Sequence, residues 1–333
     1  MSSTTAAPKP RLTTSAMIAS LAAPGQRTKP APFGNALTAL AAQNPDIVGL
    51  SADLAKYTDL HIFAKAFPER FYQMGMAEQL LMSTAAGLAR EGAIPFATTY
   101  AVFAARRAYD FICLAIAEEK LNVKIICALP GLTTGYGPSH QATEDIAIFR
   151  GCPNLTIIDP CDAHEIEQAV PAIAAHQGPV YMRLLRGNVP LVLDEYGYKF
   201  QIGKAALLRD GAEALVISSG FMTMRALEAA DLLAKDKVGA AVLHVPTIKP
   251  LDEAKIIEEA AKPGRIVVVA ENHSIVGGLG EAVAGLLLRN GINPVFRQIA
   301  LPDEFLDAGA LPTLHERYGI SAEAVARQIK GWL

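Results

Sequence analysis

The fold is decided by a stretch in the first third of the chain, Phe67–Arg90, which reads FPERFYQMGMAEQLLMSTAAGLAR. From Ala77 onward its apolar residues keep the spacing of a helix. Residues 94–99 then form an apolar run typical of a buried strand. Glu78 stands in the first turn of this helix, where the helix dipole favours a carboxylate. A helix followed by a buried strand is the repeating unit of a parallel α/β sheet.

The same unit repeats on both sides of this stretch. In the first half of the chain, strands are predicted at 47–50, 94–99, 123–129, 155–159 and 180–184, and helices at 33–41, 77–90, 102–119, 144–150 and 162–176. In the second half, strands are predicted at 214–218, 240–245, 266–270 and 294–299, and helices at 223–234, 252–261, 281–289 and from 321 to near 332. Because helical crossovers join parallel strands, we expect two consecutive α/β domains with mainly parallel sheets. The expected division is a flexible arm at 1–30, a first domain at 31–190, a linker at 191–205 and a second domain at 206–333.

Composition narrows the function classes. The 333 residues carry 30 basic and 33 acidic side chains, so the net charge is −3 and a general nucleic-acid binder is excluded. No apolar run reaches the ~18 residues of a membrane span. The four cysteines have no metal-ligand spacing, which favours a reduced, cytoplasmic protein with buried thiols. The 51% of apolar residues indicates that another subunit covers part of the surface. Residues 1–32 hold basic residues without an acid, so a transit peptide is an alternative to a solvated arm.

Ligands of open parallel sheets bind beyond the carboxyl ends of the strands. Glu78 at such an end is either a helix-terminal carboxylate or a buried acid that shares a proton with a ring nitrogen. Tyr100 and Phe103, one helical turn apart, are either core aromatics or a stacking wall for a flat ring. Gly277–Gly280 lacks a complete dinucleotide or phosphate-loop motif, so tight helix packing is the better interpretation.

Two further groups of polar residues follow strands. His140 lies in a constrained turn, Gly137–Gln141, as a surface residue or a hydrogen-bond and proton-transfer partner. Arg183 stands near the carboxyl end of the strand at 180–184 and Arg186 follows it, either as surface arginines or as a bidentate grip on a phosphate.

Three of these stretches together resemble a known family. Phe67–Gln79 with Ala85–Ala89, and Gly137–Gln141, look like the pyrimidine-binding domain of thiamine-diphosphate enzymes of the transketolase superfamily. Glu271–Gly280, ENHSIVGGLG, is similar to the start of the family's C-terminal domain. The resemblance covers roughly residues 30–330. It implies that 31–190 is a pyrimidine-binding domain and 206–333 a transketolase C-terminal domain.

The resemblance also implies a role for individual residues. The glutamate that matches Glu78 hydrogen-bonds N1′ of the cofactor's aminopyrimidine ring, and this supports proton transfer within the cofactor. The matching aromatics are Phe103, which stacks on the ring, and Tyr100 beside it. The residue that matches His140 contacts substrate hydroxyls. Arg186 and Ser51 match residues at the substrate phosphate. We expect Arg183 or Ser51 to assist Arg186 there.

The sequence departs from the family pattern at the substrate side. The family loop carries an Asp that reads a substrate hydroxyl, whereas this chain has Gly135-Tyr136-Gly137 and is one residue shorter. Tyr136 is therefore a predicted substrate contact. An arginine expected near the start of the domain is Pro30. These departures concern sugar recognition and leave the cofactor residues intact.

The resemblance also implies that a whole domain of the family, the one that holds the diphosphate, is absent from this sequence. The family holds the diphosphate through Mg²⁺ with a Gly-Asp-Gly motif and a later Asn, because this hard cation takes oxygen ligands. The single Asp-Gly pair of this chain, Asp210-Gly211, has no Gly before it. We therefore expect the C-terminal subunit of a split transketolase. Its N-terminal partner subunit would hold Mg²⁺ and share thiamine diphosphate within an α2β2 assembly. No metal ligands are predicted in this chain.

The predicted activity is transfer of a two-carbon ketol unit between phosphosugars. Alternatives are an enzyme similar to 1-deoxyxylulose-5-phosphate synthase and the β subunit of a 2-oxo acid dehydrogenase, which lipoamide-dependent activity would reveal. A non-catalytic scaffold is the third alternative, and the retained Glu78, Phe103 and His140 count against it.

Overall fold

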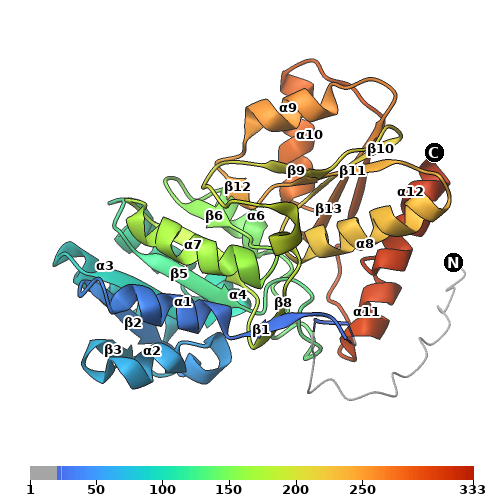
Figure 1. The fold of residues 1–333 in the computed structure, drawn as a ribbon. Helices are drawn as coiled ribbons and strands as arrows, with labels where there is room; N and C mark the ends of the chain where they lie inside the picture. The colour runs from blue at the N-terminus through green and yellow to red at the C-terminus, as the bar shows by residue number, and fades with distance from the viewer. Residues whose placement is uncertain (1–20, 24) are drawn as a thin grey trace, which may run out of the picture.

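Two parallel sheets, each flanked by helices, lie one after the other along the chain (Figure 1). The computed structural model describes residues 21–23 and 25–333. Both sheets consist mainly of parallel strands, so the predicted fold class is confirmed. Most of the expected arm, residues 1–20 and 24, lies outside the described residues.

The first sheet has seven strands in the order β12-β6-β7-β5-β4-β2-β3. Their bounds are β2 (Ile47–Ser51), β3 (Phe71–Gln73), β4 (Ile94–Tyr100), β5 (Lys124–Ala128), β6 (Thr156–Ile158), β7 (Val180–Leu184) and β12 (Thr247–Lys249). The central strands β2, β5 and β7 are buried along their whole length. A strand that is covered on both faces reads as a continuous apolar run, which is why the sequence shows these three so clearly.

Helices cover the first sheet in two groups. The helices are α1 (Pro32–Ala41), α2 (His61–Ala66), α3 (Glu78–Arg90), α4 (Ala101–Arg107), α5 (Tyr109–Phe111), α6 (Asp145–Arg150) and α7 (Ala163–Ala175). In one group α1 packs on α7, and Figure 1 shows both in front of the sheet. In the other group α4 packs on α3 and on α6. Asp162 begins α7 as predicted, because its carboxylate accepts a hydrogen bond from the Glu165 backbone N–H at 2.9 Å.

The helix predicted over 102–119 is interrupted in the structure. α4 ends at Arg107, the short α5 follows Ala108, and residues Ile112–Ala117 form a π-helix. A change from α to π geometry re-aims the side chains on either side of it. Arg107 therefore stands at the end of a helix and not in the middle of one.

The second sheet has five strands in the order β14-β13-β10-β11-β9. Its elements are β9 (Ala206–Arg209), β10 (Ala214–Ser218), α8 (Phe221–Lys235), β11 (Ala240–His244), α9 (Glu253–Ala260), β13 (Ile266–Ser274), α10 (Leu279–Arg289), β14 (Phe296–Leu301), α11 (Leu311–Arg317) and α12 (Ala322–Trp332). The edge strand β9 is antiparallel to β11. Ser321 begins α12 as predicted, with its Oγ accepting from the Ala324 backbone N–H at 3.1 Å.

Two pairings cross the expected domain limits. β12 belongs by sequence to the second domain, yet it pairs antiparallel with β6 at the edge of the first sheet. β1 (Thr28–Pro30) pairs antiparallel with β8 (Asn188–Pro190), so the expectation of a flexible arm does not hold for residues 28–30. Arg27 supports this pairing through ion pairs with Asp194 and Glu195.

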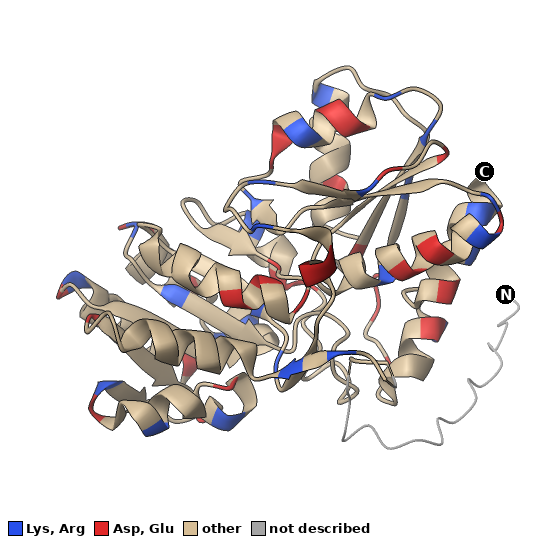
Figure 2. Cartoon of the chain, viewed as in Figure 1, with Lys and Arg blue, Asp and Glu red and all other residues tan. Residues whose placement is uncertain are grey.

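Charges of both signs are interspersed over the described helices (Figure 2). α12, for example, carries Lys330 and Glu323 within one amphipathic helix. None of the helices that the structure describes is long and apolar enough to cross a membrane.

Candidate functional site

Glu78 lies at the first residue of α3, directly after the β3–α3 turn. Gly75 provides the turn with a positive φ of 73°, a backbone conformation that glycine adopts without strain. The Glu78 residue is 3% exposed, although it is charged. Its Oε1 accepts a hydrogen bond from Nη1 of Arg107 at 2.8 Å. A carboxylate is thus held at the C-terminal edge of the sheet, where ligands of such folds bind.

An aromatic wall faces this edge from the end of β4. Tyr100 is the last residue of β4 and Phe103 lies in the first turn of α4, and their ring centroids are 5.5 Å apart. The ring of His140 lies 5.9 Å from Tyr100 and 5.5 Å from Phe103, edge-on to both. The structure therefore brings these three sequence-predicted residues together.

His140 and Tyr136 share one loop. Their ring centroids are 5.4 Å apart, and Tyr136 is 43% exposed. The hydroxyl of Ser139 contacts Nδ1 of His140 at 2.9 Å, which leaves Nε2 as the nitrogen available to a ligand. Partial burial, and secondarily the charge of Arg107, lower the pKa of His140. A neutral ring that both donates and accepts hydrogen bonds is thereby favoured.

The second domain fixes this loop. Asn272, on β13, accepts a hydrogen bond from the Leu132 backbone N–H at 2.8 Å through Oδ1. A Cβ on Gly131 would lie 2.1 Å from the Asn272 carbonyl oxygen, so only glycine allows this approach. Near the other end of the loop, Gln141 donates to the Asp307 carbonyl at 3.1 Å. The position of His140 thus depends on both domains.

Arg107 is the site residue that sequence reasoning missed. Its guanidinium carbon lies 3.9 Å from the centroid of the Phe103 ring, while Nη1 donates to Glu78. Phe103 and Arg107 are four residues apart on α4 and so share a helix face. That spacing is the signal that could have found it. Arg107 contacts two of the three residues assigned to the cofactor ring, Glu78 and Phe103.

Arg186 lines a separate cavity of about 210 Å³ beside the end of β7. Its Nε is buried without a hydrogen-bond partner. The following turn is fixed by Asp59, whose carboxylate accepts from the Gly187 backbone N–H at 2.9 Å. Burial raises the pKa of Tyr100, and the charge of Arg186 partly opposes that effect. An arginine with an unused donor is suited to an anionic group.

Ser51 is not brought into this cavity. Its side chain is fully buried, and its Oγ accepts a hydrogen bond from the Leu54 backbone N–H at 3.0 Å. In the described part of the chain no contact joins it to Arg186. Its geometry is that of a residue that shapes the β2 turn.

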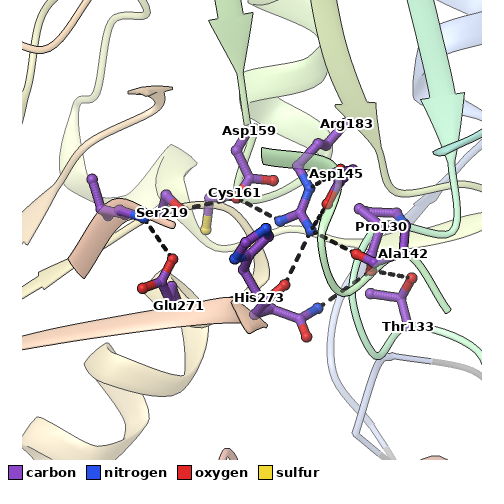
Figure 3. Close-up of polar contacts among 12 residues, drawn as sticks. Pro130, Thr133, Ala142, Asp145, Asp159, Cys161, Arg183, Ser219, Glu271 and His273 are labelled. Carbon is purple, nitrogen blue, oxygen red and sulfur yellow. Dashed lines mark hydrogen bonds and ion pairs between the residues drawn. The ribbon is translucent and has the colours of Figure 1, made fainter. Parts of the chain in front are cut away.

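Arg183 corrects an expectation. It lies inside β7 with a side chain 1% exposed, so it does not assist at a substrate phosphate. Figure 3 shows its guanidinium between Asp145 and Asp159, at 2.9 and 3.2 Å, at the junction of the domains. It also donates to the Asn272 carbonyl at 3.1 Å. In the sequence, a buried arginine and a ligand-binding arginine at the end of a strand look the same. The sequence analysis therefore could not distinguish Arg183 from Arg186.

Metal ligands do not gather in the described residues: no group of three or more His, Cys, Asp or Glu side chains is placed to hold an ion. The four cysteines are free thiols, and three of them are buried.

Family models match nearly the whole chain. The transketolase pyrimidine-binding domain matches residues 29–192, and the transketolase C-terminal domain matches residues 203–325.

The chain belongs to the transketolase family. It is 74% identical over 328 residues to a transketolase family protein of Sinorhizobium fredii, covering 98% of this chain and 95% of the relative. It is 40% identical to a 6-deoxy-6-sulfo-D-fructose transketolase subunit of a Clostridium species, covering 86% of this chain and 88% of that subunit. Its fold matches a split-gene transketolase solved as an inactive β4 tetramer, with a TM-score of 0.82 and 41% identity over 90% of this chain and 96% of that one.

The chain thus consists of the pyrimidine-binding and C-terminal domains of the transketolase family and is similar over 90% of its length to a split-gene transketolase. The pyrimidine-binding domain implies use of thiamine diphosphate.

Proposed function

We propose that this chain is the pyrimidine-domain subunit of a thiamine-diphosphate-dependent enzyme that transfers a two-carbon ketol unit between phosphosugars. The observation that carries the proposal is the convergence of Glu78, Phe103 and His140 at one edge of the sheet. A buried acid, a stacking face and a hydrogen-bonding ring are the groups that cofactor activation and sugar binding need.

The residues fit the cofactor ring. A planar group with N–H donors, the Arg107 guanidinium, already stacks on Phe103 and donates to Glu78, so the space accepts a flat nitrogen-bearing ring. Bound thiamine diphosphate supplies a carbanion equivalent for carbon–carbon bond cleavage. Glu78 holds a proton at the ring nitrogen it faces, Phe103 and Tyr100 orient the ring, and the second domain holds His140 near the substrate.

A partner is part of this proposal because the site is open on one side. Two residues on either side of Glu78 in the sequence, Met76 is 82% and Leu80 is 52% exposed. Leu114, on the π-helix that packs on α3, is 59% exposed. Apolar exposure of this kind marks a protein interface. We propose an N-terminal transketolase subunit there, which holds Mg²⁺ and the diphosphate in an α2β2 assembly.

Arg186 is the proposed reader of the donor's anionic end. Its unsatisfied Nε and the adjoining cavity suit a terminal phosphate. The Clostridium relative acts on a sulfosugar by its name, and a sulfonate has the same charge-assisted chemistry, so assays should include both end groups. Tyr136 is the proposed contact at the hydroxyl that other family members read with an Asp.

Reconstitution tests the function. The purified chain, with thiamine diphosphate and Mg²⁺, should give no ketol transfer alone and measurable transfer with the N-terminal subunit. Robust activity from the single chain would refute the split-enzyme proposal.

Glu78→Gln then tests the site within the reconstituted enzyme. Loss of one proton-sharing carboxylate should reduce turnover by roughly a hundredfold or more. The matched control is Glu119→Gln, since Glu119 also pairs with an arginine but lies in an exposed ion pair with Arg90. Near-normal turnover of Glu78→Gln would reject the cofactor assignment.

A further inference from the structure

Arg107 makes two contacts at once in the proposed cofactor site. Its guanidinium carbon lies 3.9 Å from the centroid of the Phe103 ring, a cation–π distance, and Nη1 donates to the Glu78 carboxylate at 2.8 Å. Its charge also acts on His140, whose pKa it helps to lower. One side chain therefore engages the acid, the stacking face and the substrate histidine of the proposed site.

A guanidinium resembles the aminopyrimidine ring in the properties that matter here. It is planar, it stacks on aromatic faces and it donates N–H hydrogen bonds to a carboxylate. Arg107 contacts the Phe103 ring and Oε1 of Glu78, the same two side chains that the proposed ring would contact, so Arg107 and the ring compete for them.

The burial of the two side chains indicates that the cofactor ring can replace Arg107 as the partner of Glu78 at a small cost in free energy. Glu78 is buried, and a buried carboxylate without a partner is costly. Arg107, in contrast, has a side chain 48% exposed, so its ion pair is weakened by water and its displacement costs little. A long side chain at a helix end can also turn outward into solvent by rotamer changes alone.

We propose that Arg107 is a built-in competitor of the cofactor ring: it satisfies Glu78 and covers Phe103 until thiamine diphosphate binds, and it must turn away for the ring to enter. This inference rests on the proposed function, because it concerns the same site. In this role Arg107 stabilises the cofactor-free site and lowers the apparent affinity for the cofactor.

Cofactor affinity of the reconstituted enzyme tests the competition. Arg107→Met keeps a long apolar side chain and removes the planar guanidinium with its N–H donors. Thiamine diphosphate should then bind roughly three- to tenfold more tightly in titration calorimetry, because a competing conformation is removed. Arg107→Lys, which keeps the charge but not the planar donors, should fall between Met and wild type. Arg90→Met, at the exposed pair with Glu119, is the matched control with unchanged affinity.

A double-mutant cycle in the cofactor-free full chain tests the contact itself. Glu78→Gln and Arg107→Met should each lower the unfolding midpoint, and the double variant should lose no more than the larger single loss. In the reconstituted enzyme saturated with thiamine diphosphate, this coupling should vanish. Coupling that persists at saturation would overturn the competition.

The two failures can be told apart. If Glu78→Gln weakens cofactor binding while Arg107→Met leaves it unchanged or weaker, the competition is wrong and the proposed function stands. If Glu78→Gln has no effect on cofactor binding, the proposed function itself is wrong.

Discussion

Two arginine–carboxylate contacts in the first domain show how the same chemistry serves different ends. Arg183 is 1% exposed, lies between Asp145 and Asp159, and receives further support from the Asn272 carbonyl. Arg107 is 48% exposed and meets one carboxylate over an aromatic face.

Enclosure separates the two contacts. Every partner of Arg183 is buried, and Tyr181 donates a further hydrogen bond to Asp145 at 2.6 Å. Because water cannot solvate these buried charges, breaking the cluster is costly, and the cluster holds the domains together in one arrangement. The Arg107 contact borders solvent and can be replaced, which suits a ligand site.

The largest expected effect comes from breaking the enclosed cluster. Arg183→Met leaves two buried carboxylates without their cation and should lower the free energy of unfolding by about 3–5 kcal/mol. Urea unfolding measures this loss, and Arg183→Lys, which keeps the charge, should recover part of it. Arg107→Met leaves one buried carboxylate without this partner, at a site that water reaches, and should cost less, about 1–2 kcal/mol. Equal losses at both arginines would erase the contrast.

The next effect concerns pH at the same junction. Burial is the main cause that raises the pKa of Glu271 from 4.5 to about 7. Between these values the folded chain keeps a proton that the unfolded chain has released, so the stability from Glu271 is full below pH 4.5 and is lost as pH rises through 7. The total is on the order of 3 kcal/mol. Glu271→Gln should flatten this decline in urea unfolding across the window, and Glu119→Gln should leave it unaltered.

Phe103→Ala tests the solvent-bordered contact of the two, in which Arg107 lies over the Phe103 ring. Loss of ring stacking and buried aromatic area should weaken thiamine diphosphate binding to the reconstituted enzyme by roughly tenfold, measured by titration calorimetry. Phe305→Ala, at an 82% exposed ring in the second domain, is the control. If Phe103→Ala binds normally, Tyr100 becomes the candidate for the stacking role.

The smallest effect is expected at Tyr136. Tyr136→Phe removes one hydroxyl from an exposed ring and should change the ratio of kcat/KM for ketose phosphates epimeric at C3 by only a few-fold, since a site discriminates strongly only through a well-positioned polar partner. Strong selection that survives the substitution would mean that another residue replaces the Asp of the family loop.

Local signals predicted much of this molecule. The apolar runs of β2, β5 and β7 and the helix starts at Asp162 and Ser321 depend on neighbouring residues, and the structure has them as expected. Glu78 was proposed as a site residue because the stretch around it resembles one family specifically, and its role stays a prediction.

What the sequence did not reveal depends on distant contacts. The burial of Arg183 is created by Asp145 and Asp159, and the role of Arg107 is visible only once Glu78 lies beside it. The break at Ala108 likewise interrupts a run with continuous helical spacing. Tertiary packing decides such features.

The pairing of β12 with β6 has a consequence for dividing the gene. A fragment that stops at the segment joining the two domains would lack residues 247–249 and expose the edge of β6, which is buried in the intact chain. Unpaired edges of buried strands recruit other chains into aggregates. The two domains are therefore separable as evolutionary modules only if the recombination point lies beyond Lys249, or if the recipient brings its own strand to close the sheet.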